Sequence, residues 1–511
     1  MMPGAITKSQ KCMPRPKYVW NRQPIYGLIG MMNYLLFCGL HGNPDCVARP
    51  AGKVLTLLAC GLLSGMPVGA AVHYNRVKSF GSADLPGQKP YAGVVAGSDG
   101  ALYGTTFQGG TNNAGTVFKL NRDGSGASVL HTFGTAGGDG RSPMALVEGL
   151  DMRLYGTTSI GGSNNVGTVF KLSMDGSGYT VLHHFRSIAG DGVNPQAGLV
   201  AGSDGALYGT TFFGGTNDAG TIFRLNADGS NYGVLHHFGA TAGGGQNPDA
   251  GLIEGSDKAL YGTTFYGTDS QGTVFSLNKN GSGFRVLRDF TGTDGDGAKP
   301  DATLMQTSDG ALYGTTYSGG SNNLGTVFTV NTNGTGYAVL HRFSGGASDG
   351  QRPLASLTES VDGTIYGTAY SGGSNGVGAI FKLNKDGSDY GIVRSFSSTG
   401  GDGQNPRAGL VSGGDGSFYG TTWSGGELGF GTVFRLLLPQ TPEMLGVEVL
   451  SSTVQVRFAG MSGCQYQVLR STNLLDWASL GAITMPATGT ATYVDNAPPS
   501  GAAFYRAAWV P

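Results

Sequence analysis

The sequence predicts an all-β fold: a seven-bladed β-propeller closed by an N-terminal outer strand and followed by a small C-terminal β-sandwich. The first observation is a Tyr-Gly-Thr landmark that recurs at intervals of 52 or 53 residues, which is typical of propellers, solenoids and arrays. The second is that the two ends of the repeat region complement each other. The landmark tyrosines are Tyr103, Tyr155, Tyr208, Tyr261, Tyr313, Tyr366 and Tyr419.

Each repeat contains four strand-like runs. In the second copy they are 145–149 (ALVEG), 154–158 (LYGTT), 167–172 (GTVFKL) and 179–185 (YTVLHHF), which combine alternation with β-branched and aromatic residues. Asp-Gly or Asn-Gly joins the third and fourth runs in six copies, and this pair predicts a type I′ hairpin with both central φ angles positive. A four-stranded antiparallel unit of about 50 residues is what one propeller blade requires.

The phenylalanine of each Gly-Thr-Val-Phe run is expected to fill the space between blades. These residues are Phe118, Phe170, Phe223, Phe275, Phe328, Phe381 and Phe434. An open solenoid is the alternative, but the seventh copy stops after its third run at Gly431–Leu436. The missing fourth strand lies at the other end of the repeats, over Asn75–Phe80. An N-terminal strand that completes the last repeat favours a closed ring.

The reiterated pattern G-x-L-Y-G-T-T…G-G…G-T-V-F-K-L…D-G-S…V-L-H-x-F spans roughly residues 74–436. It resembles the GloVer-type tandem repeat of bacterial secreted and surface proteins. The resemblance implies a propeller-like extracellular protein and supplies no catalytic residues.

The predicted domains are a propeller over 72–438, a linker over 439–442 and a β-sandwich module over 443–511. The pattern changes after the linker, where about five short strand-like runs occupy some 70 residues, a length that suits a compact sandwich. Arg49 and Lys53 precede an apolar run over 54–63 and small residues up to Ala71. Residues 49–71 therefore predict a secretory signal cut near Ala71, and a lipoprotein signal at Cys60 is the alternative. Residues 1–48 do not fit in front of such a signal and are interpreted as a dispensable extension before the true start.

Composition limits the partners. The net charge is −1 and charged residues make up 13% of the chain, so nucleic acid is not expected as a partner. Cys464 is the only cysteine after residue 60, which leaves no internal disulfide in a processed chain. We expect a monomer without a transmembrane anchor in the mature chain, whose partner is an extracellular polysaccharide or protein.

The long loops all leave the predicted blades at one end, because the second-to-third and fourth-to-first connections share a face. Around that face six repeats place an aromatic residue at the end of the second strand, and Ser159 is the exception. The candidate ligand-binding residues there are Phe212, Phe213, Phe265, Tyr266, Tyr317, Tyr370 and Trp423, with Phe107 completing the ring. Aromatic platforms suit sugar rings and protein hot spots; structural packing is the alternative for a position that repeats.

Repeated histidines and aspartates are given structural interpretations. His131, His183, His236 and His341 recur on the outermost strand of different blades, so we expect solvent-facing residues and no metal site. Asp139, Asp191, Asp296, Asp349 and Asp402 recur before a proline, with Gly244 in their place once. Asx-type turns explain these aspartates. No cofactor is expected, and calcium stays an alternative without the spaced carboxylates that it needs.

No catalytic motif is convincing. The two G-x-S-x-G matches do not lie at a strand-to-helix elbow, so no catalytic residue is assigned. The sequence predicts a secreted or cell-surface scaffold that binds a polysaccharide or protein on the long-loop face. An extracellular glycoside hydrolase or lyase is the alternative. Two close acidic side chains in the central funnel, one with a raised pKa, would favour the enzyme.

Overall fold

The computed structural model describes residues 73–510, apart from 189, 240–243, 415, 439–442, 451, 461–464, 487 and 502. The predicted signal over 49–71 and the extension over 1–48 lie outside the described residues. All regular elements in the described part are β-strands, as expected for an all-β protein, and no helix there is long and apolar enough to cross a membrane.

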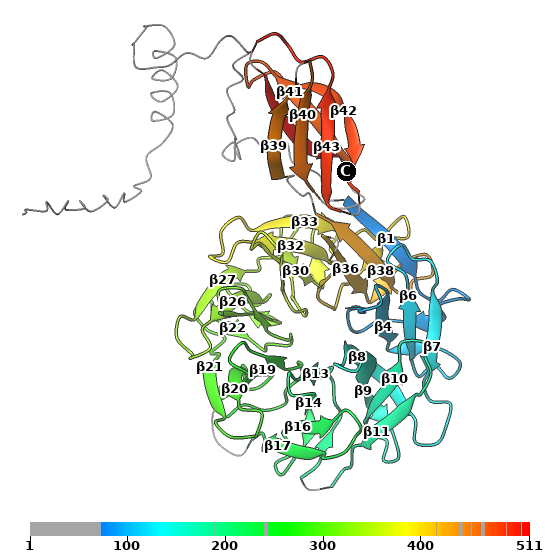
Figure 1. Cartoon of the computed structure of the whole chain (residues 1–511). Helices are drawn as coiled ribbons and strands as arrows, with labels where there is room; N and C mark the ends of the chain where they lie inside the picture. Colours follow the sequence, from blue (N-terminus) through cyan, green and yellow to red (C-terminus); the bar gives the residue numbers. More distant parts are fainter. Residues whose placement is uncertain are drawn as a thin grey trace, which may run out of the picture. The chain divides into compact units, whose positions relative to one another are not determined.

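Seven four-stranded antiparallel sheets account for the repeats, and we number them 1 to 7 (Figure 1). Sheet 1 contains β3 (Val95–Ala96), β4 (Leu102–Thr106), β6 (Thr116–Leu120) and β7 (Ser128–Thr132). Sheet 2 contains β8 (Gly140–Glu148), β9 (Arg153–Gly161), β10 (Thr168–Ser173) and β11 (Thr180–His184). Sheet 3 contains β13 (Val200–Ala201), β14 (Ala206–Thr211), β16 (Thr221–Asn226) and β17 (Gly233–His237). Sheet 4 contains β18 (Ile253–Glu254), β19 (Leu260–Thr264), β20 (Thr273–Leu277) and β21 (Arg285–Asp289).

Sheet 5 contains β23 (Met305–Gln306), β24 (Leu312–Thr316), β26 (Thr326–Val330) and β27 (Ala338–Arg342). Sheet 6 contains β29 (Thr358–Glu359), β30 (Ile365–Ala369), β32 (Ala379–Leu383) and β33 (Gly391–Ser395). Sheet 7 contains β35 (Val411–Ser412), β36 (Ser417–Thr422), β38 (Thr432–Leu437) and β1 (His73–Ser79). The N-terminal strand β1 thus pairs antiparallel with β38, from His73 opposite Leu437 to Ser79 opposite Thr432. This is the closing strand that the sequence predicts.

Five two-stranded ladders accompany these sheets at the loop end. They are β2 (Gly87–Gln88) with β5 (Gln108–Gly109), β12 (Gly192–Val193) with β15 (Phe213–Gly214), β22 (Gly297–Ala298) with β25 (Ser318–Gly319), β28 (Gly350–Gln351) with β31 (Ser371–Gly372), and β34 (Gly403–Gln404) with β37 (Ser424–Gly425). Each ladder pairs a loop that enters a sheet with the end of that sheet's second strand. The long loops are therefore tied to the strands that they follow.

Apolar clusters fill every junction between neighbouring sheets, including the junction of sheet 7 with sheet 1. The phenylalanine of each Gly-Thr-Val-Phe run is fully buried there, as predicted, and burial of one such ring contributes about 2–3 kcal/mol. The glycine of the landmark makes room for it: a Cβ on Gly104 would lie 2.5 Å from Phe118 Cζ. The seven sheets thus form a closed ring with one core cluster per junction.

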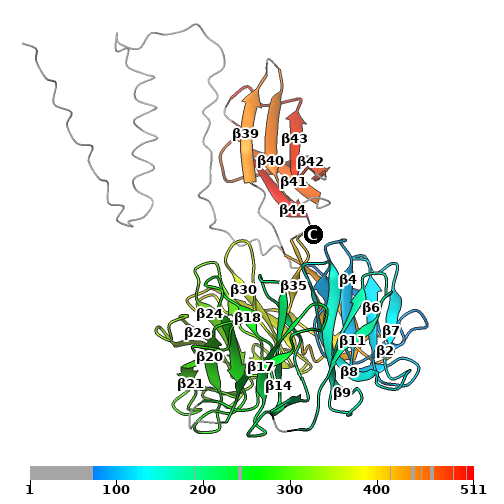
Figure 2. The ribbon, with the colours of Figure 1, turned by 60° about the horizontal axis from the view of Figure 1, so that its bottom comes forward.

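Backbone hydrogen bonds repeat around the same ring. The amide of the residue before each loop proline donates to a carbonyl of the preceding sheet, as in Ser142 to Ala114 (2.8 Å) and Asn405 to Val377 (2.7 Å). The bond from Lys89 to Phe430 (2.8 Å) joins sheet 1 to sheet 7 in the same way. The first strands lie toward the middle of the ring and the fourth strands on its circumference, and all strands run between its two ends (Figures 1 and 2).

The hairpin turns differ from the predicted type. Gly124 and its equivalents have positive φ, but the preceding Asp123 and its equivalents do not. Gly124 N–H donates to Asn121 O and Asn121 N–H donates to Ser125 O, which is a type I turn completed by a glycine bulge. The hairpin prediction is confirmed, and the type I′ assignment was wrong because only the glycine needs the left-handed conformation.

Residues 443–510 form two three-stranded sheets. One contains β39 (Glu443–Val449), β40 (Val454–Ala459) and β43 (Thr490–Asp495); the other contains β42 (Ala478–Thr484), β41 (Gln465–Ser471) and β44 (Phe504–Val510). Both contribute to one apolar core, with Val456 and Phe458 from the first and Tyr466 and Val468 from the second.

Candidate functional site

The residue that follows each loop proline, just before the first strand, differs in chemical character from one sheet to the next. We call it the inner position. It is occupied by Tyr91 in sheet 1, Gln196 in sheet 3, Asp249 in sheet 4, Asp301 in sheet 5, Leu354 in sheet 6 and Arg407 in sheet 7. Sheet 2 lacks it, because Pro143 precedes its landmark tyrosine by one residue fewer than the other prolines do. There β8 continues unbroken through the proline.

Local bonds hold each inner position on both sides. The residue before each loop proline adopts positive φ, between 53° and 56° in all seven sheets, and where an inner residue exists it lies two positions further on. The residue after it offers a carbonyl to a threonine of the preceding sheet, as in Thr210 Oγ1 to Ala250 O (3.0 Å) and Thr421 Oγ1 to Ala92 O (2.9 Å). A side chain at the inner position is therefore presented by a backbone that neighbouring sheets fix.

Asp249 and Asp301 occupy the inner positions of two adjacent sheets and interact directly. Burial raises the pKa of Asp249, and burial together with the neighbouring carboxylate raises the pKa of Asp301 well above its ordinary value. Both side chains are partly exposed, while Asp249 Oδ1 is itself buried and has no hydrogen-bond partner among the described residues. The doubly ionised state of this pair is disfavoured, because burial penalises each charge and the two carboxylates repel each other.

Arg407 and Tyr91 form the opposite part of this site. Arg407 Nη2 donates to Tyr91 Oη (2.6 Å), and its guanidinium carbon lies 4.0 Å from the centroid of the Tyr91 ring. Phe107 and Trp423 complete an aromatic cluster, with ring centroids 5.7 and 6.1 Å from that of Tyr91. Arg407 thus stacks on an aromatic surface built by sheets 7 and 1.

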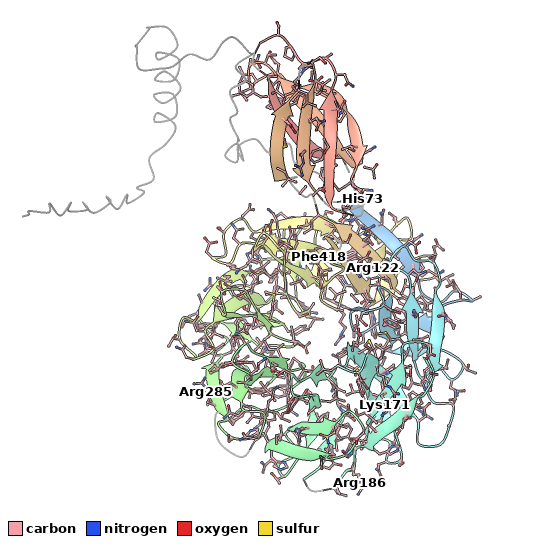
Figure 3. All side chains as sticks on the ribbon, viewed as in Figure 1. His73, Arg122, Lys171, Arg186, Arg285 and Phe418 are labelled. Atoms are coloured by element: carbon pink, nitrogen blue, oxygen red, sulfur yellow. The ribbon has the colours of Figure 1, made fainter. Side chains whose placement is uncertain are left out.

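Electrostatic interactions cross the middle of the ring. The positive charge of Arg407 offsets part of the rise in pKa at Asp249 and Asp301, and these two carboxylates add to the burial that raises the pKa of Tyr91. Sheets 7 and 1 are not neighbours of sheets 4 and 5, so the four side chains face one another across the centre. The opposite edge of each sheet is different: the labelled Arg186 and Arg285 lie on the outer circumference (Figure 3).

The predicted aromatic residues lie beside the inner positions. In six sheets the backbone amide of the aromatic residue donates to the carbonyl two residues before the inner position, as in Trp423 to Asn405 (3.1 Å) and Phe265 to Asn247 (3.0 Å). Sheet 2 has Ser159 instead, in the sheet that also lacks an inner residue, and its hydroxyl donates to Ser142 O (3.2 Å). The aromatic residue and the inner residue therefore form one structural unit. Sheet 2, which lacks the inner residue, also has a serine in place of the aromatic residue.

Contacts between these aromatics are uneven. Phe107 and Trp423 lie 6.1 Å apart between centroids, whereas Phe212 and Phe265 make their edge-to-face contacts with the residues that follow them, Phe213 (4.7 Å) and Tyr266 (5.0 Å). Phe213 is 40% exposed; Phe212, Phe265, Tyr266, Tyr317, Tyr370 and Trp423 are partly buried. Their binding role stays a prediction.

Cations surround the same aromatics. Lys89 lies over Trp423 (5.5 Å), Lys299 over Phe265 (5.4 Å) and Arg352 over Tyr317 (5.3 Å). All three occupy the left-handed position two residues before the inner position. Sequence reasoning missed both these cations and the inner residues, because it read the segment as a loop before proline. The signal that could have found them is a single variable residue between the repeated proline and the repeated Ala-Gly-Leu pattern.

The repeated histidines and aspartates belong to a different structure at the circumference. A His or Arg of one outer strand, the loop Asp and a Tyr of the next outer strand form a group that we call a junction triad. In one of them, His341 stacks on Tyr390 at 3.5 Å, and Tyr390 Oη donates to Asp349 Oδ1 (2.5 Å). The five triads are His131–Asp139–Tyr179, His183–Asp191–Tyr232, Arg288–Asp296–Tyr337, His341–Asp349–Tyr390 and Arg394–Asp402–Tyr74.

These triads correct two interpretations. The histidines do not face solvent, since the side chains of His131, His183 and His341 are 16–18% exposed. The aspartates do not simply cap Asx turns: Asp349 is 5% exposed and accepts from the Ser344 and Gly350 amides as well as from Tyr390. Within the described residues no cluster of three or more His, Cys, Asp or Glu could hold a metal ion.

Two small cavities lie away from the centre. One of about 110 Å³ is lined by Leu150, Tyr155 and Ala227 between sheets 2 and 3, and one of about 320 Å³ by Tyr74, Arg394 and Asp402 at the last junction triad. The charged residues Arg394 and Asp402 that line the second cavity pair with each other, unlike Arg407 at the centre of the ring.

Residues 68–271, 175–306 and 266–461 match the model of the Gloeobacter/Verrucomicrobia repeat. The chain belongs to this repeat family. The resemblance stated from the sequence is confirmed, and the family match extends across the seven sheets. No curated protein matches the chain.

Solved structures with a similar arrangement share little sequence. The extracellular domain of a protein provisionally described as a hybrid two-component system, from B. thetaiotaomicron, is 11% identical with a TM-score of 0.49, over 83% of this chain and 55% of its own. The chain thus spans about half the length of that structure. A protein provisionally described as a 6-phosphogluconolactonase, from Bacteroides fragilis, is 14% identical with a TM-score of 0.42, over 77% of this chain and 97% of its own.

Proposed function

We propose that this protein is a secreted or cell-surface binding protein that recognises a polysaccharide at the centre of a seven-bladed β-propeller. Seven four-stranded sheets, one apolar cluster at every junction and the pairing of β1 with β38 support the propeller. The two C-terminal sheets with their common core support a small β-sandwich, which we assign to attachment. Export through residues 49–71 belongs to the same proposal.

The observation that carries the binding proposal is the inner position. A repeat that is nearly uniform elsewhere places Tyr91, Gln196, Asp249, Asp301 and Arg407 around one centre. Carboxylates, an amide and a guanidinium bind the hydroxyl groups of sugars through directed hydrogen bonds. Aromatic faces beside them, at Phe107 and Trp423, suit the apolar faces of sugar rings. Rigid scaffolds commonly display their ligand-binding groups in this way.

A polysaccharide and glycan array, followed by calorimetry on the purified full chain, tests this function. We expect at least one polymer to bind, and the double variant D249N/D301N to bind it at least tenfold more weakly because it removes the carboxylate acceptors. D294N is the matched control, since Asp294 is an exposed aspartate in a loop between sheets 4 and 5. Failure of every polymer to bind, or equal binding by D249N/D301N, would overturn the proposal and leave a protein partner.

Hydrolysis of the bound polymer is a second candidate, favoured by the raised pKa values of Asp249 and Asp301. A pair that shares one proton contains a general acid and a general base side by side. The base could take a proton from water while the acid gives one to the leaving oxygen. Carboxyls that share a proton are nevertheless closer than the separation of about 5 Å or more found in glycosidases. For this reason binding ranks first.

Product analysis on the same polymers separates the two candidates. Hydrolysis requires new reducing ends with the wild type, a loss of at least 100-fold in D249N and in D301N, and normal turnover in D294N. Tight binding without any new reducing ends would exclude hydrolysis and leave the binding function intact.

A further inference from the structure

The charged groups at the loop end of the ring indicate the chemical class of the ligand. Within the described residues Arg407 has one polar partner, the Tyr91 hydroxyl, and forms no ion pair. The carboxylates that face it, Asp249 and Asp301, act across the centre. A partly buried guanidinium that stacks on tyrosine and has free N–H groups is suited to bidentate binding of a carboxylate.

The surrounding cations are also without acidic partners. Lys89, Lys299 and Arg352 lie over aromatic rings and form no ion pair among the residues that the structure describes. Lysines at the opposite end of the ring behave differently: Lys119 pairs with Asp99 (2.9 Å), Lys279 with Glu254 (2.7 Å) and Lys385 with Glu359 (2.7 Å). Within the described part of the chain, Lys89, Lys299 and Arg352 at the loop end are thus unpaired, whereas these three lysines at the opposite end each have an acidic partner.

Backbone geometry indicates that these cations are there for a reason other than folding. The same left-handed position is Asn194, Asn247 and Asn405 in three sheets and Ser142 in a fourth. Asparagine adopts this conformation readily, whereas a long side chain does so at a cost. Asn247 Nδ2 also donates to Phe212 O (2.8 Å) and Asn405 Nδ2 to Tyr370 O (3.1 Å). A lysine or arginine at this position gives up that bond. Strained residues of this kind concentrate at binding sites.

We infer that the ligand is an acidic polysaccharide whose uronate carboxylate binds Arg407, with Lys89, Lys299 and Arg352 attracting the neighbouring acidic residues. This inference rests on the proposed function, because it concerns the same central site. The sugar ring would lie against Phe107 and Trp423, and its hydroxyl groups would donate to the partly exposed carboxyl groups of Asp249 and Asp301. The raised pKa of Asp301 disfavours full ionisation of the aspartate pair opposite Arg407, which limits its repulsion of an acidic chain.

Matched polymers test the acidic group without changing the sugar backbone. Polygalacturonate, alginate and hyaluronan are each compared by calorimetry with their own carboxyl-reduced forms, beside dextran sulfate as an anion without carboxylates. We expect one uronate polymer to bind at least tenfold more tightly than its reduced form, with affinity falling as salt rises.

Variants assign the effect to the residues named. R407M should remove most of the preference for the uronate polymer over its reduced form, and R407K should restore the charge but only part of the preference, since lysine lacks the bidentate fork. The triple variant K89N/K299N/R352N should reduce the salt dependence. R153M is the control, because Arg153 is an exposed arginine at the other end of the ring, next to Asp151. Circular dichroism checks that each variant is folded.

The outcomes distinguish this inference from the function beneath it. Equal binding of a uronate polymer and its reduced form, or tighter binding of dextran sulfate, would overturn the carboxylate assignment while polysaccharide binding stands. Binding of neutral polymers alone would also overturn the carboxylate assignment and leave polysaccharide binding intact. If no polymer of any kind binds, the proposed function itself fails.

Discussion

At the level of one residue, Lys299 occupies a backbone position that folding alone would not assign to a lysine. Its φ is 56°, a conformation that asparagine takes at the equivalent position of three other sheets. Its ammonium group lies over Phe265 and Tyr266 instead of pairing with an acid. Folding would be served better by asparagine, so the lysine points to recognition of a ligand.

The substitution K299N is therefore expected to leave the free energy of unfolding unchanged or to raise it by up to about 1 kcal/mol. The new amide can donate to Phe265 O as Asn247 donates to Phe212 O. Chemical denaturation measures the change. K258N is the matched control, since Lys258 also has positive φ (68°) but lies in a turn at the opposite end. A loss of more than about 1 kcal/mol in K299N alone would assign the lysine a structural role instead.

The sequence predicts the aromatic residues of the site but not the inner residues beside them. Trp423 and Phe265 end a strand whose alternation is visible, so their shared face can be inferred from period and topology. Asp249 and Arg407 lie three repeats apart in the sequence, in two different loops, and nothing local indicates that they meet across a centre. Only the closed ring brings them together. The raised pKa values of Asp249 and Asp301 depend on burial and on the distance between the two groups, which a sequence does not contain.

At the level of elements, the junction triads tie each outer strand to the next. They change as units along the chain: where Gly244 replaces the aspartate, Phe284 replaces the tyrosine, and His236 stacks on that Phe284 at 3.9 Å. Without a carboxylate partner, burial lowers the pKa of His236 to about 4. The histidine, aspartate and tyrosine are thus one structural element, which explains why reading each residue separately misplaced the histidines.

The triad at the junction of sheets 5 and 6 can be used to test whether the residues of a triad act as one unit. D349N leaves several donors poorly satisfied and is expected to cost about 2–3 kcal/mol of unfolding free energy, and Y390F about 1 kcal/mol. Their double-mutant cycle should show coupling of at least about 0.5 kcal/mol. The exposed Asp294 provides the control variant D294N, for which we expect less than about 0.5 kcal/mol. Additive losses would mean that the tyrosine and aspartate act independently.

Acid should reduce this contribution. Burial alone would raise the pKa of Asp349, but hydrogen bonds from His341, Tyr390 and Ser344 outweigh it and hold the pKa below the ordinary value. A lowered carboxyl pKa stabilises the fold above the ordinary value near 3.8 and loses that effect as the pH falls toward the folded-state pKa. The difference in unfolding free energy between the wild type and D349N should therefore be smaller at pH 3 than at pH 7.

At the level of the whole molecule, the first strand closes the ring that the last repeat leaves incomplete. β1 pairs with β38 and also supplies Tyr74 to the triad between sheets 6 and 7. The junction of sheets 7 and 1 has no triad, because Lys78, Pro86 and Ala127 occupy its three positions. At the centre, that same junction holds Arg407, Tyr91, Phe107 and Trp423. Two junctions of the described sheets thus lack an outer triad, that of sheets 3 and 4 and that of sheets 7 and 1, and the second of them carries the aromatic and cationic half of the site.

The repetition of seven sheets builds the frame, and the inner position is where one sheet differs from another. The central claim is that a ligand binds where these differences meet. A crystal structure of the full chain with a uronate oligosaccharide that binds it tests this claim most directly. We predict the sugar at the centre of the ring, with its carboxylate on Arg407 and a hydroxyl group on Asp249 or Asp301. An oligosaccharide bound at the circumference or on the C-terminal sheets, with nothing at the centre, would contradict it.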